Sequence, residues 1–465
     1  MSDPLAAHLA RVAAEARRTG RPLLAAWRER APGTLDPLAC FAAAGTERCY
    51  WSVPAQGLAI AGEGAVAAVE AAGAARFADA AARARALFAG LRSGTEPGDG
   101  TAPAEASPLL LGAFAHGDEA STHAPWAGLP PLRFTLPERT FVRAGARAWR
   151  ILCAQVGPAD DPERIAARLR TPDPPARAPA DPAGEDAAPG FAVRADRSPR
   201  AYRRGVATAL AAIARGELEK VVLARACRVA RRGRFDAARV LATLARQHPG
   251  CFVFGIGTGA ACFVGASPER LVRRDALRVR VSALAGSTPR GRTPDEDAQL
   301  ARTLRESKKE QAEHAVVRRA IAAALAPVCA ELDVPEAPDL LRLDGVQHLH
   351  TAIEGRLQPG APPDLLALAG RLHPTPAIGG APRAAARAFL ARHEALDRGL
   401  YGGGVGWLAA GGNGELAVAL RCALLQGGRA TLWAGAGVVE GSEPEAELAE
   451  TRLKLRAALA ALVEL

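Results

Sequence analysis

The chain has 465 residues, a net charge of +10 and a mean hydropathy of zero, so it can hold one large domain or two to three ordinary ones. Its arginines are spread along the chain, aromatic residues make up 5%, and no helix-turn-helix, RNA-binding or zinc-finger pattern occurs. The positive charge is therefore explained by an anionic small substrate, or by compositional drift alone, in preference to nucleic acid. Eight cysteines without a C-x-x-C pair indicate reduced thiols in the cytoplasm, and no apolar run approaches the roughly 20 residues that span a membrane.

Lysine is rare in this chain, although basic residues are not. Of the 59 Lys and Arg residues, 55 (59 − 4) are arginine, and the lysines are Lys220, Lys308, Lys309 and Lys454. Because a guanidinium cannot act as a base near neutral pH, a retained lysine can mark a position that needs a neutral amine. Lys220 and Lys454 have suggestive surroundings, whereas Lys308 and Lys309 are expected on the surface. The alternative is that all four are remaining surface lysines.

Residues 1–156 are predicted to contain short strands among alanine-rich helices. The first helix is expected over 1–18, and strands at 58–61, 109–114 and 148–154. Gly62-x-Gly64-x-x-Ala67 resembles a dinucleotide-binding fingerprint. We reject it, because helix-like sequence continues through Phe88 without a second strand that ends in an acidic residue. Residues 157–198 are rich in Pro, Ala and Asp and predict a partly extended surface connection.

Residues 199–465 show a denser succession of strands and helices. Strands are predicted at 220–225, 251–256, 261–265, 269–274, 277–283, 403–409, 415–425 and 430–434. Helices are predicted at 200–215, 294–326, 363–372, 382–395 and at the C-terminal end. Most neighbouring strands are joined by tight turns. The pattern therefore predicts an α+β fold with antiparallel sheets packed against helices, not a repeated βαβ unit.

Two pairs of glutamates share a spacing that puts each pair on one helix face. Glu310 and Glu313 are three residues apart in the long helix, and Glu447 and Glu450 are three apart in the last one. Lys454 follows Glu450 by four residues and extends the same stripe. Carboxylates without Cys or His at ligand spacing suit a hard cation such as Mg²⁺. The alternative is two solvated helix faces, since pairs at this spacing are common.

Four other polar residues stand in apolar surroundings. Glu269 follows a strand at a Ser-Pro turn, which would display it at a sheet edge or make it a structural turn carboxylate. Arg421 lies in an apolar predicted strand, where a guanidinium is costly unless it meets an anion. His348 and His350 lie on one side of a predicted strand. Without a third ligand at a motif spacing, we do not favour zinc there.

Taken in order, these motifs resemble the chorismate-utilising enzymes. The segments that carry the resemblance are Lys220-Val-Val-Leu-Ala-Arg225, Gly265-Ala-Ser-Pro-Glu-Arg270, Leu284-Ala-Gly-Ser287, Glu313-His314, His373-Pro-Thr-Pro-Ala377, Gly435-Ala-Gly437 and Glu447-x-x-Glu450-Thr-x-x-Lys454. The resemblance implies two large, mainly antiparallel β-sheets packed together and flanked by helices. It also implies a chorismate-binding catalytic domain at 199–465, a connection at 157–198, and a variable N-terminal part of the same fold at 1–156.

Residue choices within the motifs distinguish the branches of this family. Members that use ammonia generally have glutamine at the position of Lys220, and members that add water have lysine. Ala285 stands where aminodeoxychorismate synthases carry a nucleophilic lysine, and no glutamine-amidotransferase segment or partner subunit is expected. His373-Pro-Thr-Pro-Ala-Ile-Gly-Gly380 is similar to the version in isochorismate-forming members. The resemblance therefore implies an isomerase that converts chorismate to isochorismate. The alternative is a salicylate synthase, which would also eliminate pyruvate.

The resemblance also implies roles for individual residues. Lys220, whose apolar strand favours a neutral amine, is the expected base for a water that attacks C2, and Glu269 is the expected acid for the C4 hydroxyl. Mg²⁺ is the expected cofactor, with the ligand candidates Glu313, Glu450, Glu310 and Glu447. The residues expected to hold chorismate are Gly286, Ser287, His348, Ala377, Arg421, Gly435 and Lys454. We expect a monomer, and the sequence leaves open whether menaquinone, siderophore or salicylate biosynthesis uses the product.

Overall fold

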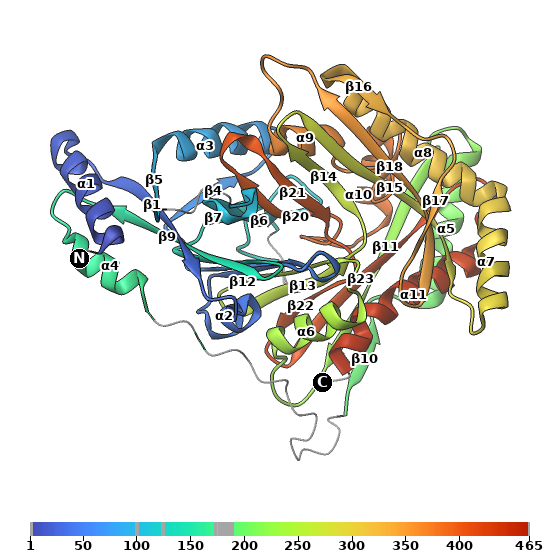
Figure 1. The fold of residues 1–465 in the computed structure, drawn as a ribbon. Coiled ribbons are helices and arrows are strands. Elements are labelled where there is room, and N and C mark those ends of the chain that lie inside the picture. The colour runs from blue at the N-terminus through green and yellow to red at the C-terminus, as the bar shows by residue number, and fades with distance from the viewer. Residues whose placement is uncertain (1–2, 98–101, 122–125, 172–173, 175–189, 464–465) are drawn as a thin grey trace.

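Two β-sheets packed against each other form the centre of the molecule, and helices flank them (Figure 1). The structure is a computed structural model and describes residues 3–97, 102–121, 126–171, 174 and 190–463. Large buried side chains such as Trp51, Phe114 and Trp407 belong to the main hydrophobic core. Among the described strands, the β1–β5 pair is parallel and the other pairs are antiparallel. The predicted α+β fold with two large, mainly antiparallel sheets is confirmed.

The first sheet has thirteen strands. Their spatial order is β10 (Ala192–Ala195), β11 (Lys220–Ala230), β23 (Arg429–Val438), β22 (Cys422–Gln426), β13 (Ala261–Ser267), β12 (Phe252–Thr258), β2 (Arg48–Val53), β3 (Leu58–Glu63), β8 (Arg139–Ala144), β9 (Arg147–Val156), β1 (Leu23–Ala31) and β5 (Leu91–Thr95), with β19 (Gly380–Ala381) beside β11.

The second sheet has ten strands. Their spatial order is β16 (Cys329–Asp333), β18 (Val346–Leu357), β15 (Arg278–Pro289), β14 (Arg270–Asp275), β21 (Gly414–Val418), β20 (Gly404–Ala409), β6 (Leu109–Phe114), β7 (Leu132–Leu136) and β4 (Ala67–Ala71), with β17 (Asp339–Arg342) beside β18.

Strands from residues 1–156 continue both sheets from one side. In the first sheet, β2 pairs with β12 over Arg48 to Ser52. In the second sheet, β6 pairs with β20 along its whole length. Each sheet is therefore completed by the N-terminal part of the chain, and the two junctions are antiparallel ladders of backbone hydrogen bonds.

The chain crosses from one sheet to the other at two neighbouring places, which lie at the same level of the sheets. The chain leaves β13 of the first sheet and enters β14 of the second across Pro268 and Glu269, and it leaves β21 of the second sheet for β22 of the first across residues 419–421. The two crossings contact each other, because the N–H of Ala266 donates to Arg421 O at 3.2 Å and the N–H of Val418 donates to Glu269 O at 3.0 Å. Both crossings lie in the space between the sheets.

Eleven helices lie in the described part of the chain. They are α1 (Pro4–Thr19), α2 (Pro37–Ala43), α3 (Arg76–Gly90), α4 (Pro162–Leu169), α5 (Pro199–Ala214), α6 (Ala237–Gln247), α7 (Pro294–Glu306), α8 (Lys308–Leu325), α9 (Leu365–Leu372), α10 (Arg383–His393) and α11 (Pro444–Val463). Helix α8 packs on β15 and β18, and α11 packs on β23. Within the described residues, every helix is too short or too polar to cross a membrane.

Several predicted elements differ from the structure, and the strand predicted over 415–425 is one of them, because it is divided into β21 and β22. The helix-like reading through Phe88 was wrong over Ala67–Ala71, where alanine-rich sequence forms β4 because its backbone pairs with β7. The helix predicted over 294–326 is two helices, because Ser307 leaves the helical conformation and its side chain caps the N–H of Glu310. The connection at 157–198 contains α4 and β10, and most of its Pro-rich middle lies outside the described residues.

Candidate active site

One small pocket between the two sheets collects most of the residues singled out in the sequence. Its wall includes the predicted site residues Glu269, Gly286, Ser287, Glu313, His348, Ala377, Arg421, Gly435, Glu450 and Lys454. They come from β15 and β18 of the second sheet, β23 of the first, helices α8 and α11, the two crossings, and the loop between α9 and β19, which carries Ala377. Lys220 reaches this group through Glu313, whereas Glu310 and Glu447 stand outside the described lining.

Lys220 begins β11, and its side chain is fully buried. Its Nζ lies 2.8 Å from Glu313 Oε1, as an ion pair whose angles do not meet hydrogen-bond geometry. Gly437 on the paired strand β23 makes room for this contact. A Cβ at Gly437 would lie 2.1 Å from Glu313 Oε1 and 2.9 Å from Lys220 Cε, so only glycine fits beneath the pair. The Gly-x-Gly segment was predicted to admit a ligand, and its second glycine instead admits two side chains of the protein.

The last helix supplies a second carboxylate with its own lysine. Lys454 Nζ lies 2.6 Å from Glu450 Oε1 one turn away, and it also donates to the carbonyl of Gly435 at 3.0 Å. Burial by itself would raise the pKa of Glu450, but the Lys454 ammonium holds this pKa below its ordinary value. Glu450 is therefore an anion that faces the pocket at neutral pH.

Lys309 is a member of the site that the sequence reading missed. It was expected on the surface with Lys308, yet its Nζ lies 3.0 Å from Glu310 Oε1 and 2.8 Å from Glu447 Oε1. The ammonium thus joins α8 to α11 and neutralises one glutamate of each predicted pair. The signal was Ser307, because a helix that begins there places Lys309 in its first turn beside Glu310. Lys308 is exposed, as expected.

Glu269 lies at the crossing between β13 and β14, so its predicted place at a sheet edge was wrong. Its residue is 2% exposed, and its Oε1 has no hydrogen-bond partner among the described residues. Burial raises the pKa of Glu269 to about 8, against the opposing charges of Lys220, Lys454 and Arg421. The carboxyl group is therefore protonated at neutral pH and can donate a proton.

Arg421 lies at the other crossing, between β21 and β22. The prediction of one long strand over 415–425 was wrong there. Its φ of 49° is in the left-handed region, which is unfavourable for a side chain with a Cβ. Its Nη2 lies 3.0 Å from His348 Nε2, and His348 Nδ1 lies 2.8 Å from Ser287 Oγ. Because a guanidinium can only donate, His348 Nε2 accepts and Nδ1 carries the proton. Burial, followed by the charge of Arg421, keeps the pKa of His348 well below its usual value, so the ring is neutral.

Backbone groups and apolar side chains complete the wall. Gly286 has a φ of 78° at a bulge in β15, and a Cβ there would lie 3.1 Å from Glu310 Oε2. The N–H of Ser287 donates to the same Glu310 oxygen at 3.2 Å. The sequence reading also missed several lining residues, which are Val222, Leu284, Ile378, Tyr401, Leu420 and Trp433. Their side chains are largely apolar, as those of core residues are, so their residue type alone does not distinguish a pocket wall from the hydrophobic core.

The carboxylates that face the pocket fit a hard divalent cation. Glu313 and Glu450 line it from two helices, each beside a lysine of its own, while Glu310 and Glu447 share Lys309 outside the described lining. The described residues hold no cluster of three or more His, Cys, Asp or Glu placed for a metal ion. Two carboxylates with open positions for substrate and water are the usual protein contribution to Mg²⁺. The residues present therefore fit this ion.

Comparisons with known proteins show what the whole chain is similar to. A family model described as "Chorismate binding enzyme" matches residues 10–463. The salicylate biosynthesis isochorismate synthase of Pseudomonas aeruginosa is 40% identical over 362 residues, which cover 77% of this chain and 74% of that protein. Isochorismate synthase DhbC of Bacillus subtilis is 41% identical over 271 residues, 57% of this chain and 68% of the relative. The solved structure of MenF, the menaquinone-specific isochorismate synthase from Escherichia coli, matches with a TM-score of 0.78 at 26% identity, covering 98% of this chain and 100% of that chain.

Proposed function

Because this chain belongs to the family of chorismate-binding enzymes, we propose that it is the isomerase that converts chorismate to isochorismate. One observation carries the proposal: a buried lysine at the start of β11 and a protonated carboxylic acid at the crossing between β13 and β14 adjoin one pocket, Glu269 in its wall and Lys220 through Glu313. Lys220 is the first of the positive charges that oppose the raised pKa of Glu269. A base and an acid on separate elements are what the exchange of an allylic hydroxyl requires.

The proposed reaction follows from these two groups. Lys220, as a neutral amine, takes a proton from a water molecule whose oxygen forms a bond to C2 of the ring. The ring double bonds shift, the C4–oxygen bond breaks, and Glu269 gives its proton to the departing hydroxyl, which leaves as water. One water enters and one leaves, so the product is an isomer of the substrate. In the reverse direction the Glu269 carboxylate is the base and the Lys220 ammonium is the acid.

The remaining polar groups bind and orient the substrate. Arg421 and Lys454 supply positive charge for the carboxylates of chorismate, and the backbone around Gly286, Ala377 and Gly435 approaches it closely. Glu313 and Glu450 would hold Mg²⁺. When bound, this ion would supply a Lewis acid that binds and orients a carboxylate of the substrate. Glu313 also contacts Lys220, so the same carboxylate would link the cation to the base.

One feature supports isochorismate over salicylate as the final product, since the segment 373–380 is similar to that of isochorismate-forming members. Ala285 argues separately against an aminodeoxychorismate synthase, because it excludes a covalent lysine adduct in its motif. The relative from Pseudomonas aeruginosa is named a salicylate biosynthesis isochorismate synthase. We further propose a monomer without an amidotransferase subunit in the reducing cytoplasm, where the eight buried free thiols would stay reduced.

Product analysis tests the proposed function directly. The purified chain, incubated with chorismate and Mg²⁺ and followed by chromatography, is expected to form isochorismate reversibly and without pyruvate. Pyruvate released in step with the loss of chorismate would assign the chain to the salicylate branch. Anthranilate formed in the presence of ammonium would overturn the assignment of Lys220 to water.

Two substitutions test the metal ligands. Glu313→Gln and Glu450→Gln should each abolish turnover and weaken Mg²⁺ binding by more than the ~10–100-fold that loss of an outer-shell partner costs, because a neutral amide is a poor ligand for this ion. Calorimetric titration with Mg²⁺ measures the affinity without turnover. Glu443→Gln, an exposed glutamate just before α11, is the control. Near-normal Mg²⁺ affinity in either variant would show that this glutamate is not a metal ligand and only belongs to a solvated helix face.

Lys220→Arg tests the base. Arginine keeps the positive charge but has no accessible neutral form, so kcat should fall by about 10²–10⁴-fold while the chain stays folded. Steady-state rates with chorismate and a thermal unfolding curve make the measurement. Lys308→Arg, on the surface, should leave both unchanged. If Lys220→Arg kept most of its activity, the lysine would serve only charge or packing.

The raised pKa of Glu269 predicts where its carboxyl group loses its proton. Burial moves this pKa upward from the ordinary 4.5 to about 8, so the acid form needed for proton donation persists up to about pH 8. The C=O stretch of the protonated carboxyl, followed in infrared difference spectra of the wild type against Glu269→Gln, should therefore disappear as pH rises through about 8. Glu269→Gln stays neutral but has no acidic proton, so it should lose about 10²–10⁴-fold in rate. A carboxyl group that has already lost its proton at pH 6 would contradict the assignment of Glu269 as the acid.

A further inference from the structure

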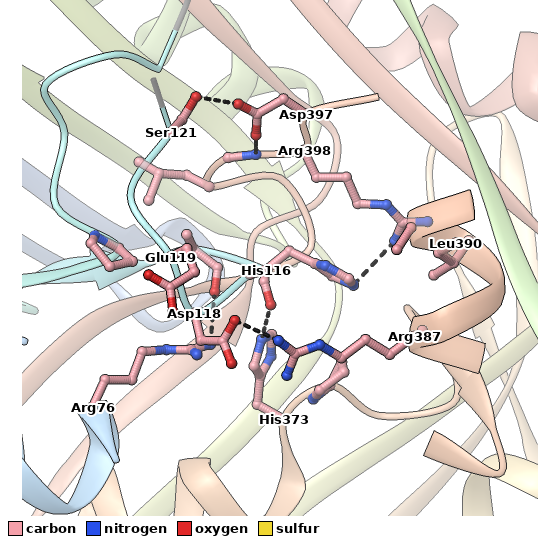
Figure 2. A pocket seen from close by; sticks show the side chains of 18 of the residues that line it. Arg76, His116, Asp118, Glu119, Ser121, His373, Arg387, Leu390, Asp397 and Arg398 are labelled. Carbon is pink, nitrogen blue, oxygen red and sulfur yellow. Dashed lines mark hydrogen bonds and ion pairs between the residues drawn. The ribbon is translucent and has the colours of Figure 1, made fainter. Parts of the chain in front are cut away.

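A second cavity, of about 450 Å³, is drawn in Figure 2. It shares a wall with the catalytic pocket. His373, Pro374, Gly379 and Gly380 face this cavity, while Ala377 and Ile378 of the same loop face the catalytic pocket. The second cavity favours neither anions nor cations, because its described lining pairs four arginines (Arg76, Arg383, Arg387 and Arg398) with four acids (Asp118, Glu119, Glu394 and Asp397). Its informative feature is therefore the wall itself, which holds a buried ion pair.

Arg398 and Glu394 form that ion pair. Both side chains are 4% exposed, and the guanidinium grips the carboxylate with two hydrogen bonds of 2.6 Å. The other donors of Arg398 reach Ile378 O at 2.8 Å and Val222 O at 2.7 Å. Figure 2 shows the guanidinium also directed at His116, whose Nε2 lies 3.3 Å away. One side chain thus connects the loop at 373–380 with strand β11.

The pair occupies a gap in the first sheet. On its outer edge, β11 pairs with β19 at Lys220 and Val221 and with β10 at 227–230. The N–H of Val222 still donates to Gly379 O and Ala226 O accepts from the N–H of Asp196, so the strand pairing is interrupted between these two contacts. Glu394 accepts the N–H of Ala224 at 2.8 Å, and Arg398 donates to the carbonyl of Val222. Two side chains therefore replace the missing strand, and they do so two and four residues after Lys220.

The two segments joined in this way are both functional. Val222 and Ile378 line the catalytic pocket. Val222 lies two residues after the proposed base Lys220 on β11, and Ile378 directly follows the predicted substrate contact Ala377. We propose that the Arg398–Glu394 pair positions the substrate-binding loop relative to the strand of Lys220, an inference that rests on the proposed function. Arg398 is a positioning residue, because its donors are engaged by Glu394, Ile378 and Val222 and it acts on the pocket through these groups.

Arginine is required for this role by its geometry. A planar guanidinium offers five donors in fixed directions and can serve a carboxylate and two carbonyls at once, whereas an ammonium has three donors at one point. A lysine in place of Arg398 could keep the ion pair with Glu394 but could not also reach the carbonyls of Val222 and Ile378. A shift of the substrate by about 1 Å can cost about 10²-fold in rate.

The test is Arg398→Lys, which retains the buried charge, with Arg387→Lys as the control. Arg387 lies on the neighbouring helix α10, lines the same cavity and pairs with Asp118, but its side chain is exposed. In Arg398→Lys we expect kcat/KM for chorismate to fall by about 10²-fold, with KM raised and the apparent Mg²⁺ affinity unchanged. Hydrogen exchange in the peptide over 373–381 should become faster, and the control should match the wild type in each measurement.

A second variant guards against misfolding. Glu394→Gln combined with Arg398→Gln removes both charges together, so neither one is left buried alone, and it should show the same rise in KM for chorismate. Kinetic constants in Arg398→Lys equal to those of the control would overturn the proposal. Equal losses of chorismate and Mg²⁺ affinity with a lowered melting temperature would also overturn it, because they describe general destabilisation. If the wild type does not turn over chorismate, the proposed function fails, and the exchange rates still report whether Arg398 holds the loop.

Discussion

The paired crossings between the sheets are the constraint on which the site depends. Two adjacent strands leave one sheet for the other at the same level, and the backbone between them cannot continue either ladder. This opens a space inside a fold whose sheets otherwise bury apolar side chains. Glu269 and Arg421 stand at the two crossings, so an acid and a cation enter the interior where both sheets are interrupted together. The left-handed φ of Arg421 is a local cost of this arrangement.

The negative charge of the four glutamates in the site is balanced by three lysines, each of which contacts its own glutamate or pair of glutamates. Four glutamates on α8 and α11 meet three ammonium groups: Lys220 contacts Glu313, Lys454 contacts Glu450, and Lys309 serves the other two. A compact ammonium can stand between two carboxylates of different helices, where a planar guanidinium would need more room. Three of the four lysines in this lysine-poor chain therefore stand beside the four glutamates of the two predicted pairs.

The sequence predicts much of the fold, because its signals there are local. Turn residues between apolar runs located most strands of residues 199–465, and the spacing of the glutamates placed each pair correctly on one helix face. Three features could not be predicted in this way. The break at 419–421 lies in a run that is apolar except for Arg421. It exists because β21, before the break, pairs in the second sheet, whereas β22, after it, pairs in the first. The strand β4 has a helix-favouring composition that pairing with β7 overrides. Lys309 depends on where α8 begins and on a second helix far along the chain.

The shared construction of the sheets has a consequence for how the chain folds. Residues 199–465 contain every group of the candidate site, but without residues 1–156 the edges of β12 and β20 would have no partner. Both strands are mostly buried, and unpaired apolar edges are templates for association between chains. The N-terminal part therefore acts as a built-in protection against aggregation. During synthesis it is made first, so its strands are already available when the catalytic segment emerges and needs something to pair with.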